Sequence, residues 1–138
     1  MTAYVDASVL LRFVLGQPDR LEALRRIHSR VTSLLAQVEC LRVIDALRIG
    51  NDLSEEEYAA KRLEVFTQVR RMERVTVSRS VLDSAAAPLP VRLKTLDAIH
   101  LATAVQWRQR RASALVFATH DRQLGRAAAA LGFPVIGV

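Results

Sequence analysis

Four acidic side chains adjoin apolar segments that are expected to form the core of this protein. They are Asp6, which ends a short apolar run, Glu39 and Asp97, which lie within apolar helical segments, and Asp121, which follows another apolar run. An ionised carboxylate loses its hydration when it is buried, so acids at such positions are usually paired or bound to a metal ion. We therefore expect the four carboxylates to converge on one pocket that binds hard divalent cations.

Such a pocket would suit the hydrolysis of phosphate esters. Mg²⁺ and Mn²⁺ prefer oxygen ligands and are commonly bound by a few carboxylates together with water and substrate phosphates. Two such ions about 4 Å apart can activate a water and stabilise the leaving oxygen. Without a cation the carboxylates would repel one another, and some would take up protons. The pattern predicts a pocket that is destabilised when empty and tightened by metal.

Each acid also has a structural explanation. Asp97 and Asp121 lie in the first turns of expected helices, where a carboxylate interacts favourably with the helix dipole. Glu39 could form an ion pair with a nearby arginine. Asp6 is the hardest to explain in this way, because neither a helix nor an obvious cation accounts for it at the end of a strand.

Short apolar strands alternate with helices along the chain. Strands are predicted at residues 3–6, 31–32, 74–77, 114–118 and 135–136, and helices at residues 8–15, 20–30, 33–49, 54–72, 79–87, 95–111 and 121–131. This alternation predicts an α/β fold with a parallel sheet covered by helices on both faces. Because sites in such sheets form beyond the carboxyl ends of the strands, Asp6 and Asp121 are expected at the same edge.

Three of these helices have specific sequence signals. Leu21, Leu24 and Ile27 recur at a spacing of three, which predicts one apolar face in the helix at residues 20–30. Ser54 and Glu57 form a possible capping box at the start of the helix at residues 54–72. Thr95 is the expected cap of the helix that contains Asp97.

The bulk composition predicts one globular domain spanning residues 1–138, since 51% of the 138 residues are hydrophobic. No apolar run approaches the roughly 20 residues that span a bilayer, and the N-terminus has no secretory signal pattern. A single cysteine is consistent with a cytoplasmic protein. The net charge of +6 suits a polyanionic partner such as RNA, although nearly all the basic residues are arginines, which can also reflect genome base composition.

Four segments of the sequence resemble the PIN-domain nucleases, and among them the toxin ribonucleases of VapBC toxin–antitoxin systems. The segments are residues 4–12, Glu39 within its long helix, residues 95–104 and residues 118–121, and the resemblance extends from Tyr4 to Val138. It implies a three-layer α/β/α sandwich with a central, mainly parallel sheet. It also implies Mg²⁺- or Mn²⁺-dependent endonucleolytic cleavage of RNA, homodimers, and inhibition by a small VapB-like antitoxin.

The same resemblance implies roles for individual residues. The acidic quartet, catalytic and metal-binding, corresponds to Asp6, Glu39, Asp97 and Asp121. Ser8 and Thr119 match small hydroxyl positions that hold metal waters or orient the acids. Arg12, one helical turn past Ser8, is a candidate contact to the substrate. Many relatives have a further acid after the fourth position, but residues 122–124 supply none here, so the choice between one and two metal ions stays open.

Other polar residues near the quartet have competing interpretations. His100, three residues after Asp97, could act as a general base, but a packing histidine that orients a neighbour is the favoured interpretation. A thiol nucleophile at Cys40 is set aside, because an isolated cysteine in an apolar helix usually serves packing. Asp45 lies about 240° around its helix from Glu39, at 100° per residue, and is expected to form an ion pair or to be exposed.

Two other functions compete with a metal-dependent endoribonuclease. A nucleic-acid-binding or partner-binding module with a vestigial pocket would bind RNA without cutting it. A phosphatase-like hydrolase of small substrates is disfavoured, because the sequence has neither a glycine-rich phosphate cradle nor a nucleophilic Asp-x-Asp pair.

Overall fold

The computed structural model describes residues 1–18 and 21–138 and contains one five-stranded sheet. The strands are β1 (Thr2–Val5), β2 (Ser29–Ser33), β3 (Glu73–Val75), β4 (Leu115–Ala118) and β5 (Val135–Ile136). They are arranged in the order β3-β2-β1-β4-β5, and every neighbouring pair is parallel. The predicted parallel sheet is confirmed. From β1 the chain adds β2 and β3 on one side of the sheet and β4 and β5 on the other, so the strand order reverses between β1 and β4.

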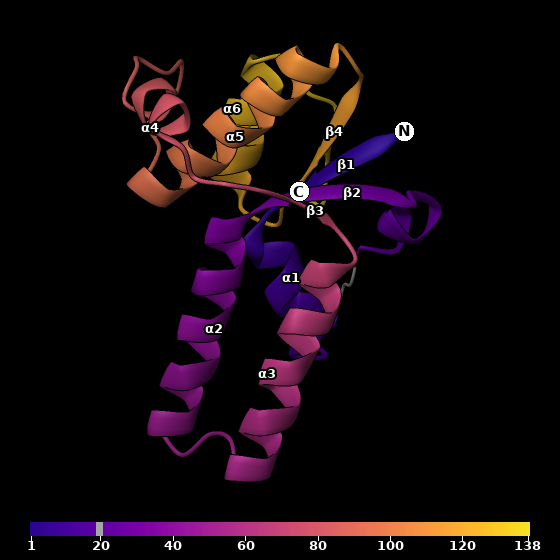
Figure 1. The fold of residues 1–138 in the computed structure, drawn as a ribbon, viewed down its shortest axis with the longest axis vertical. Coiled ribbons are helices and arrows are strands. Elements are labelled where there is room, and N and C mark those ends of the chain that lie inside the picture. Colours follow the sequence, from indigo (N-terminus) through magenta and orange to yellow (C-terminus); the bar gives the residue numbers. More distant parts are fainter. Residues whose placement is uncertain (19–20) are drawn as a thin grey trace.

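Helices cover both faces of this sheet and complete a three-layer α/β/α sandwich (Figure 1). Below the sheet in Figure 1 lie α1 (Ala7–Val14), α2 (Leu34–Ile49) and α3 (Glu55–Arg70). Above it lie α4 (Arg79–Ala85), α5 (Thr95–Arg111) and α6 (Arg122–Ala130). This arrangement confirms the fold class expected from the sequence.

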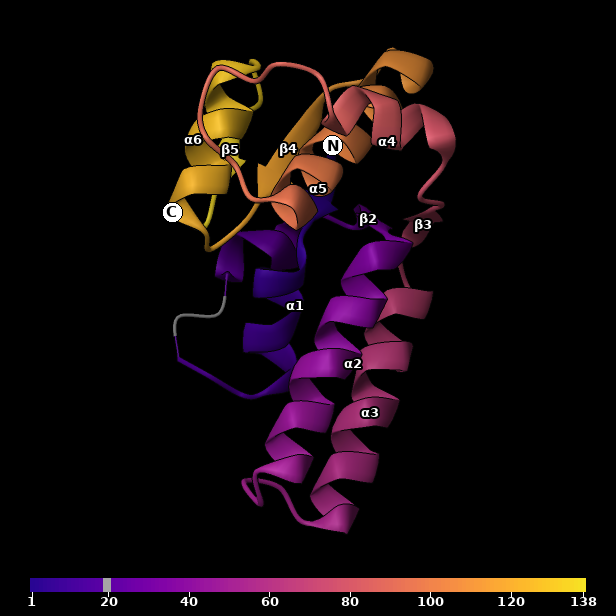
Figure 2. The ribbon, with the colours of Figure 1, turned by 90° about the vertical axis from the view of Figure 1, so that its left-hand side faces the viewer.

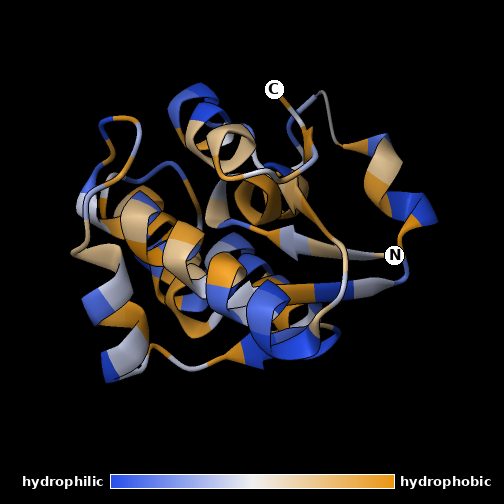
Figure 3. Cartoon of the chain, turned by 90° about the horizontal axis from the view of Figure 1, so that it is seen from above, coloured by the Kyte–Doolittle hydropathy of each residue, from blue (hydrophilic) through white to orange (hydrophobic). Residues whose placement is uncertain are grey.

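Alternate strand residues supply two separate apolar cores, because successive side chains of a strand point to opposite faces. Ala3 and Val5 of β1 belong to the core beneath α1, α2 and α3. Tyr4 and Phe117 belong to the core that includes residues of α5 and α6. Hydrophilic residues gather at the helix ends and in the connecting loops (Figure 3).

Helices α2 and α3 lie side by side as a long hairpin whose far end projects away from the sheet (Figure 2). The turn contains Asn51 with a positive φ of 60°. The predicted capping box at the start of α3 is confirmed, since the Glu57 N–H donates to Ser54 Oγ at 3.1 Å and the Ser54 N–H donates to Glu57 Oε1 at 3.1 Å.

Two local predictions are wrong. Instead of a helix at residues 20–30 there is a short 3₁₀-helix, Glu22–Arg26, and the chain is extended from Ser29. A spacing of three suits a 3₁₀-helix as well as an α-helix, and pairing of β2 with β1 and β3 requires the extended backbone. Residues 19 and 20, also part of that predicted helix, lie outside the described residues. The N-cap of α5 is Lys94 rather than Thr95, and its side chain makes no capping hydrogen bond.

Within the two described ranges, none of the helices combines the length and the apolar character that crossing a membrane requires.

Candidate active site

Asp6 occupies the carboxyl end of the central strand β1 and is also the N-cap of α1. Its Oδ1 accepts a hydrogen bond from the Val9 N–H at 3.3 Å. Only 4% of the residue is exposed. The expectation that no helix accounts for this acid is therefore wrong, because α1 begins one residue earlier than the sequence pattern suggested. Capping alone does not require burial, since most N-caps lie at the surface.

Two hydroxyls orient the Asp6 carboxylate and connect it to the end of β4. Ser8 Oγ donates to Asp6 Oδ1 at 2.6 Å, and Thr119 Oγ1 donates to Asp6 Oδ2 at 2.7 Å. Thr119 Oγ1 in turn accepts the Asp121 N–H at 3.0 Å, and Ser8 Oγ accepts the His120 N–H at 2.9 Å. Burial raises the pKa of Asp6, and the hydrogen bonds from Ser8 and Thr119 partly oppose this shift.

Asp121 and Asp97 line one cleft. Asp121 is the N-cap of α6, where its Oδ1 accepts the Leu124 N–H at 2.8 Å. Asp97 lies in the first turn of α5. The cleft between these helix starts has a volume of about 370 Å³, and its lining consists of Arg92, Leu93, Lys94, Asp97, Asp121 and Gln123.

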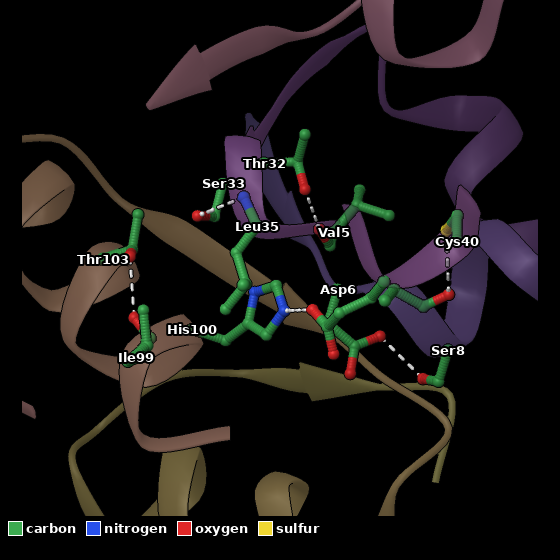
Figure 4. A network of polar contacts seen from close by, with 12 residues as sticks. Val5, Asp6, Ser8, Thr32, Ser33, Leu35, Cys40, Ile99, His100 and Thr103 are labelled. Atoms are coloured by element: carbon green, nitrogen blue, oxygen red, sulfur yellow. Dashed lines mark hydrogen bonds and ion pairs between the residues drawn. The ribbon is translucent and has the colours of Figure 1, made fainter. Parts of the chain in front are cut away.

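Glu39, on α2, approaches the same region from the other helical layer. The Nε2 atom of His100 is hydrogen-bonded to Glu39 Oε1, and the Tyr4 hydroxyl lies 2.7 Å from His100 Nδ1. The imidazole and the carboxylate of Asp6 point toward the same space (Figure 4). The interpretation of His100 as a buried residue that orients a neighbour agrees with these contacts.

The other three carboxylates act electrostatically on Asp97. The pKa of Asp97 is raised first by burial, then by the negative charges of Asp121 and Asp6 and, after an opposing effect of His100, by that of Glu39. The structure thus gathers the acids predicted from the sequence at one edge of the sheet. Their burial was overestimated, since Asp121 is exposed and Glu39 and Asp97 are half-buried.

The carboxylates do not form a ready ligand cage. Among residues 1–18 and 21–138, no three His, Cys, Asp or Glu side chains are close enough together to hold a metal ion. The catalytic and metal-binding roles of the quartet, and the role of Ser8 and Thr119 toward metal waters, therefore stay predictions.

The alternative interpretations of Cys40 and Asp45 are resolved by their surroundings. Cys40 is fully buried, and burial with the negative charges of Glu39 and Asp6 raises its pKa to about 12. A thiol held protonated in this way is a poor nucleophile, which supports the packing role. Asp45 forms ion pairs with Arg42 and Arg48, each at 2.8 Å, as expected for an acid on another face of α2.

Two cations that line the cleft with Asp97 and Asp121 were not found from the sequence. Arg92 and Lys94 share the cleft with Asp97, whereas no ion pair within the described residues joins Arg12 to any of the four acids. The contact between Arg12 and substrate stays a prediction. The sequence did contain a signal for these two cations. Arg92 and Lys94 lie five and three residues before Asp97, in the loop that leads into its helix.

Replacing Gly137 by Ala is expected to destabilise the protein by about 1–3 kcal/mol, a usual cost for backbone strain, and to displace Thr119. Gly137 has φ +104°, and a Cβ atom there would lie 2.3 Å from the Thr119 carbonyl oxygen. Because Thr119 positions Asp6, any activity of the site should fall as well. Thermal unfolding of Gly137→Ala can be compared with Gly50→Ala, at a position with φ −77°. Equal unfolding midpoints for the two variants would contradict the prediction.

The fold and the position of its acids together indicate the class of protein. The molecule is an α/β/α protein with an acidic site at the point where its sheet reverses direction, the usual location of sites in open parallel sheets. The sequence matches the PIN domain family over residues 3–130. This chain belongs to the PIN domain family.

Individual relatives agree with this assignment over nearly their whole length. Ribonuclease VapC46 of Mycobacterium tuberculosis (strain ATCC 25618 / H37Rv) is 36% identical, and the match covers 96% of this chain and 95% of the relative. A toxin–antitoxin complex from Klebsiella pneumoniae has a chain with a TM-score of 0.67 at 19% identity, covering 97% and 95% of the two chains. The structure of VapBC2 from Rickettsia felis, bound to a promoter DNA fragment, has a chain with a TM-score of 0.67 at 12% identity. The match covers 98% of this chain and 97% of that chain. These two structures share the fold.

Proposed function

We propose that this protein is an endoribonuclease, the toxin of a type II toxin–antitoxin system, acting in the cytoplasm as a single domain over residues 1–138. The observation that supports this most directly is the electrostatic effect of Asp121, Asp6 and Glu39 on Asp97 at the edge of a PIN-domain sheet. The 36% identity to a protein named as a ribonuclease supports RNA as the substrate.

We further propose Mg²⁺ or Mn²⁺ as the cofactor, bound by Asp6, Glu39, Asp97 and Asp121. The donor set fits a hard cation because it consists of carboxylates. The pKa of Asp97 is raised first by burial and then by repulsion from Asp121 and Asp6, and a cation would relieve this repulsion. When bound, such an ion would polarise the phosphodiester and lower the pKa of water. Since the side chains do not form a closed cage, binding of the ion would have to draw the carboxylates closer together.

The chain's own residues would divide the remaining work. Asp6 is held by Ser8 and Thr119, so its carboxylate is fixed in orientation before substrate arrives. Arg92 and Lys94 give the cleft beside Asp97 and Asp121 positive charge, which would bind the RNA phosphates that flank the scissile bond.

Replacing Lys94 by Gln is expected to weaken RNA binding and to lower its salt dependence. Each phosphate contact to a single strand contributes about 0.7 to the slope of log affinity against log salt concentration, so one lost contact should reduce the slope by about that amount. Fluorescence anisotropy of a labelled RNA at several salt concentrations measures it. Arg25→Gln removes the same charge from the short 3₁₀-helix, where Arg25 pairs with Glu22 at 3.1 Å. An equal slope for the two variants would refute a specific role for Lys94.

We propose a VapB-like antitoxin as the partner and a homodimer as the assembly. The solved structures with this fold include a toxin–antitoxin complex and a VapBC complex bound to promoter DNA, which supports a partner of this kind. Co-expression with the product of the neighbouring gene tests this. Co-purification of a small protein that suppresses RNA cleavage is the expected result.

A catalytically weak RNA-binding or partner-binding module remains the second candidate. The lack of an assembled three-residue ligand group among the described residues favours it. A labelled RNA incubated with the protein and Mg²⁺, then separated on a denaturing gel, distinguishes the two functions. Shorter fragments support the nuclease, whereas retarded but intact RNA in a native gel supports the binding module.

A further inference from the structure

We infer that His100 is a positioning residue that fixes the Glu39 carboxylate in the acidic site, and that Tyr4 fixes the orientation and tautomer of His100. This inference rests on the proposed function, because Glu39 matters only if the site binds metal and cleaves RNA. The sequence indicated that His100 orients a neighbour, but it identified neither Glu39 as that neighbour nor any role for Tyr4.

Tyr4, His100 and Glu39 form a chain of two hydrogen bonds, here called the relay, that runs from the central strand to α2. Tyr4, on β1, is 0% exposed, and His100, on α5, is 1% exposed. The Tyr4 hydroxyl lies 2.7 Å from His100 Nδ1, and His100 Nε2 contacts Glu39 Oε1. The relay therefore joins a strand, a helix above the sheet and a helix below it.

The donors and acceptors of the relay admit one consistent assignment with a neutral imidazole. An ionised carboxylate can only accept hydrogen bonds, so the proton of the ring must lie on Nε2 and point to Glu39. Nδ1 is then an acceptor, and the Tyr4 O–H is the donor that it faces. The ring is also held in place by edge-on packing, since the Tyr4 and His100 ring centroids are 5.9 Å apart at 71°.

Tyr4 is itself held rigidly. Its ring stacks on Phe117 of the neighbouring strand, with centroids 5.1 Å apart and planes at 23°. Its backbone is paired on both sides, with Val31 of β2 and Phe117 of β4. The hydroxyl that sets the tautomer therefore belongs to a ring that is held by a strand paired on both sides and by stacking on Phe117.

The site needs such a restraint on Glu39. The Glu39 side chain is 22% exposed, so it has a route to solvent, and it shares the edge with the like charges of Asp6 and Asp97. Repulsion from those charges would favour rotamers that carry the carboxylate outward. The hydrogen bond from His100 opposes this movement and keeps one Glu39 oxygen at the site. Outer partners of metal-binding carboxylates act in this way in other proteins.

Two substitutions of His100 separate positioning from packing. In His100→Gln the amide nitrogen can replace Nε2 and donate to Glu39. In His100→Asn the shorter amide can replace Nδ1 and contact Tyr4, but it cannot reach Glu39. Packing alone predicts similar behaviour for the two variants. Positioning predicts that Mn²⁺ affinity falls about 10-fold or more in His100→Asn and stays near that of the wild type in His100→Gln.

Tyr4→Phe tests the second half of the relay. Without the hydroxyl, the ring proton can move to Nδ1 and leave a lone pair facing Glu39, so Mn²⁺ affinity should fall. In the His100→Gln background the same change should have no effect on affinity, because no imidazole remains to be oriented. This dependence on background is the signature of two residues that act through one group.

Mn²⁺ affinity is measured by electron paramagnetic resonance of the free ion, and kcat and KM for a labelled RNA are measured separately. We expect kcat to follow Mn²⁺ affinity at limiting metal, with KM for RNA unchanged. Val65→Ala, a core substitution on α3 at a residue that is 1% exposed, controls for lost stability and should keep the wild-type affinity.

Equal Mn²⁺ affinities of His100→Asn and the wild type would overturn this inference but not the proposed function. Equal losses in His100→Asn and His100→Gln, or an undiminished effect of Tyr4→Phe in the His100→Gln background, would do the same. A wild-type protein that binds no Mn²⁺ and leaves RNA intact would overturn the proposed function as well. If His100→Asn does not fold, the two Tyr4→Phe measurements decide the question.

Discussion

Asp97→Asn is expected to reduce RNA cleavage by roughly 10²–10³-fold or more, while the protein stays folded. The substitution keeps the shape of the side chain but removes one of the charges that would bind the cation, and charge stabilisation by a metal is worth several kcal/mol in the transition state. Cleavage of a labelled RNA under single-turnover conditions measures the effect. Wild-type activity in a pure preparation of Asp97→Asn would refute the proposed mechanism.

The same variant should be more stable than the wild type when metal is absent. Burial and neighbouring acids raise the pKa of Asp97, so the native state binds this proton more tightly than the unfolded chain does. The wild type must therefore lose stability as the pH rises from the ordinary Asp pKa of 3.8 through the raised native value. The Asp97→Asn variant has no ionisable group at this position and no such loss, so the unfolding midpoints should agree near pH 3 and the midpoint of the variant should be the higher one at pH 7.

Asp45→Asn is the matched control for both effects. Asp45 is an acid in an apolar stretch of α2, but it pairs with Arg42 and Arg48 rather than with the quartet. Its pKa is lowered by these arginines, which is the opposite direction from Asp97. The control should keep full cleavage activity and should not gain stability at neutral pH.

Removal of divalent cations by EDTA is expected to abolish cleavage and to lower the unfolding midpoint. A ligand present at 100 times its dissociation constant stabilises the native state by about 2.7 kcal/mol, which corresponds to roughly 5–10 °C for a domain of this size. Mn²⁺ added in excess of EDTA should restore both the activity and the midpoint. Differential scanning fluorimetry and the RNA gel provide the two measurements.

Asp97→Asn also controls for nonspecific effects of the cation. If metal stabilises the protein by binding among the four carboxylates, the rise in midpoint with Mn²⁺ should be much smaller in this variant. A full rise in the variant would place the stabilising ion elsewhere on the protein. Cleavage that persists in EDTA would exclude a dissociable metal from the reaction.

The sequence was sufficient to predict the elements and the edge at which the acids meet. Parallel strands have their carboxyl ends at one edge, so Asp6 and Asp121 could be brought together without coordinates. The helix at residues 20–30 was predicted wrongly because the spacing of apolar residues carries no information on strand pairing. Pairing of β2 with its neighbours makes the backbone extended from Ser29 onward. Arg12 was proposed as a substrate contact because its proximity to Ser8 along the helix is visible in the sequence, whereas the cleft that Arg92 and Lys94 line is not.

The hydrogen bonds inside the site were beyond the reach of sequence patterns. Tyr4 and His100 are 96 residues apart, and His100 and Glu39 are 61 residues apart. Periodicity assigns Tyr4 to a strand and His100 to a helix but fixes neither the packing angle between them nor the rotamers. Which neighbour a buried histidine orients depends on those quantities.

The helix caps formed by Asp6 and Asp121 would link the proposed nuclease activity to the abundance of the protein in the cell. Losing an N-cap costs about 0.5–2 kcal/mol, so most substitutions at these two positions would increase the unfolded fraction as well as remove a charge. Proteases clear unfolded chains, and a loss of this size can lower steady-state levels several-fold. Mutations at these positions that abolish activity would therefore also tend to lower the amount of protein. Asn caps a helix almost as well as Asp, so an Asn substitution at either position is the change that could leave a stable but inactive protein.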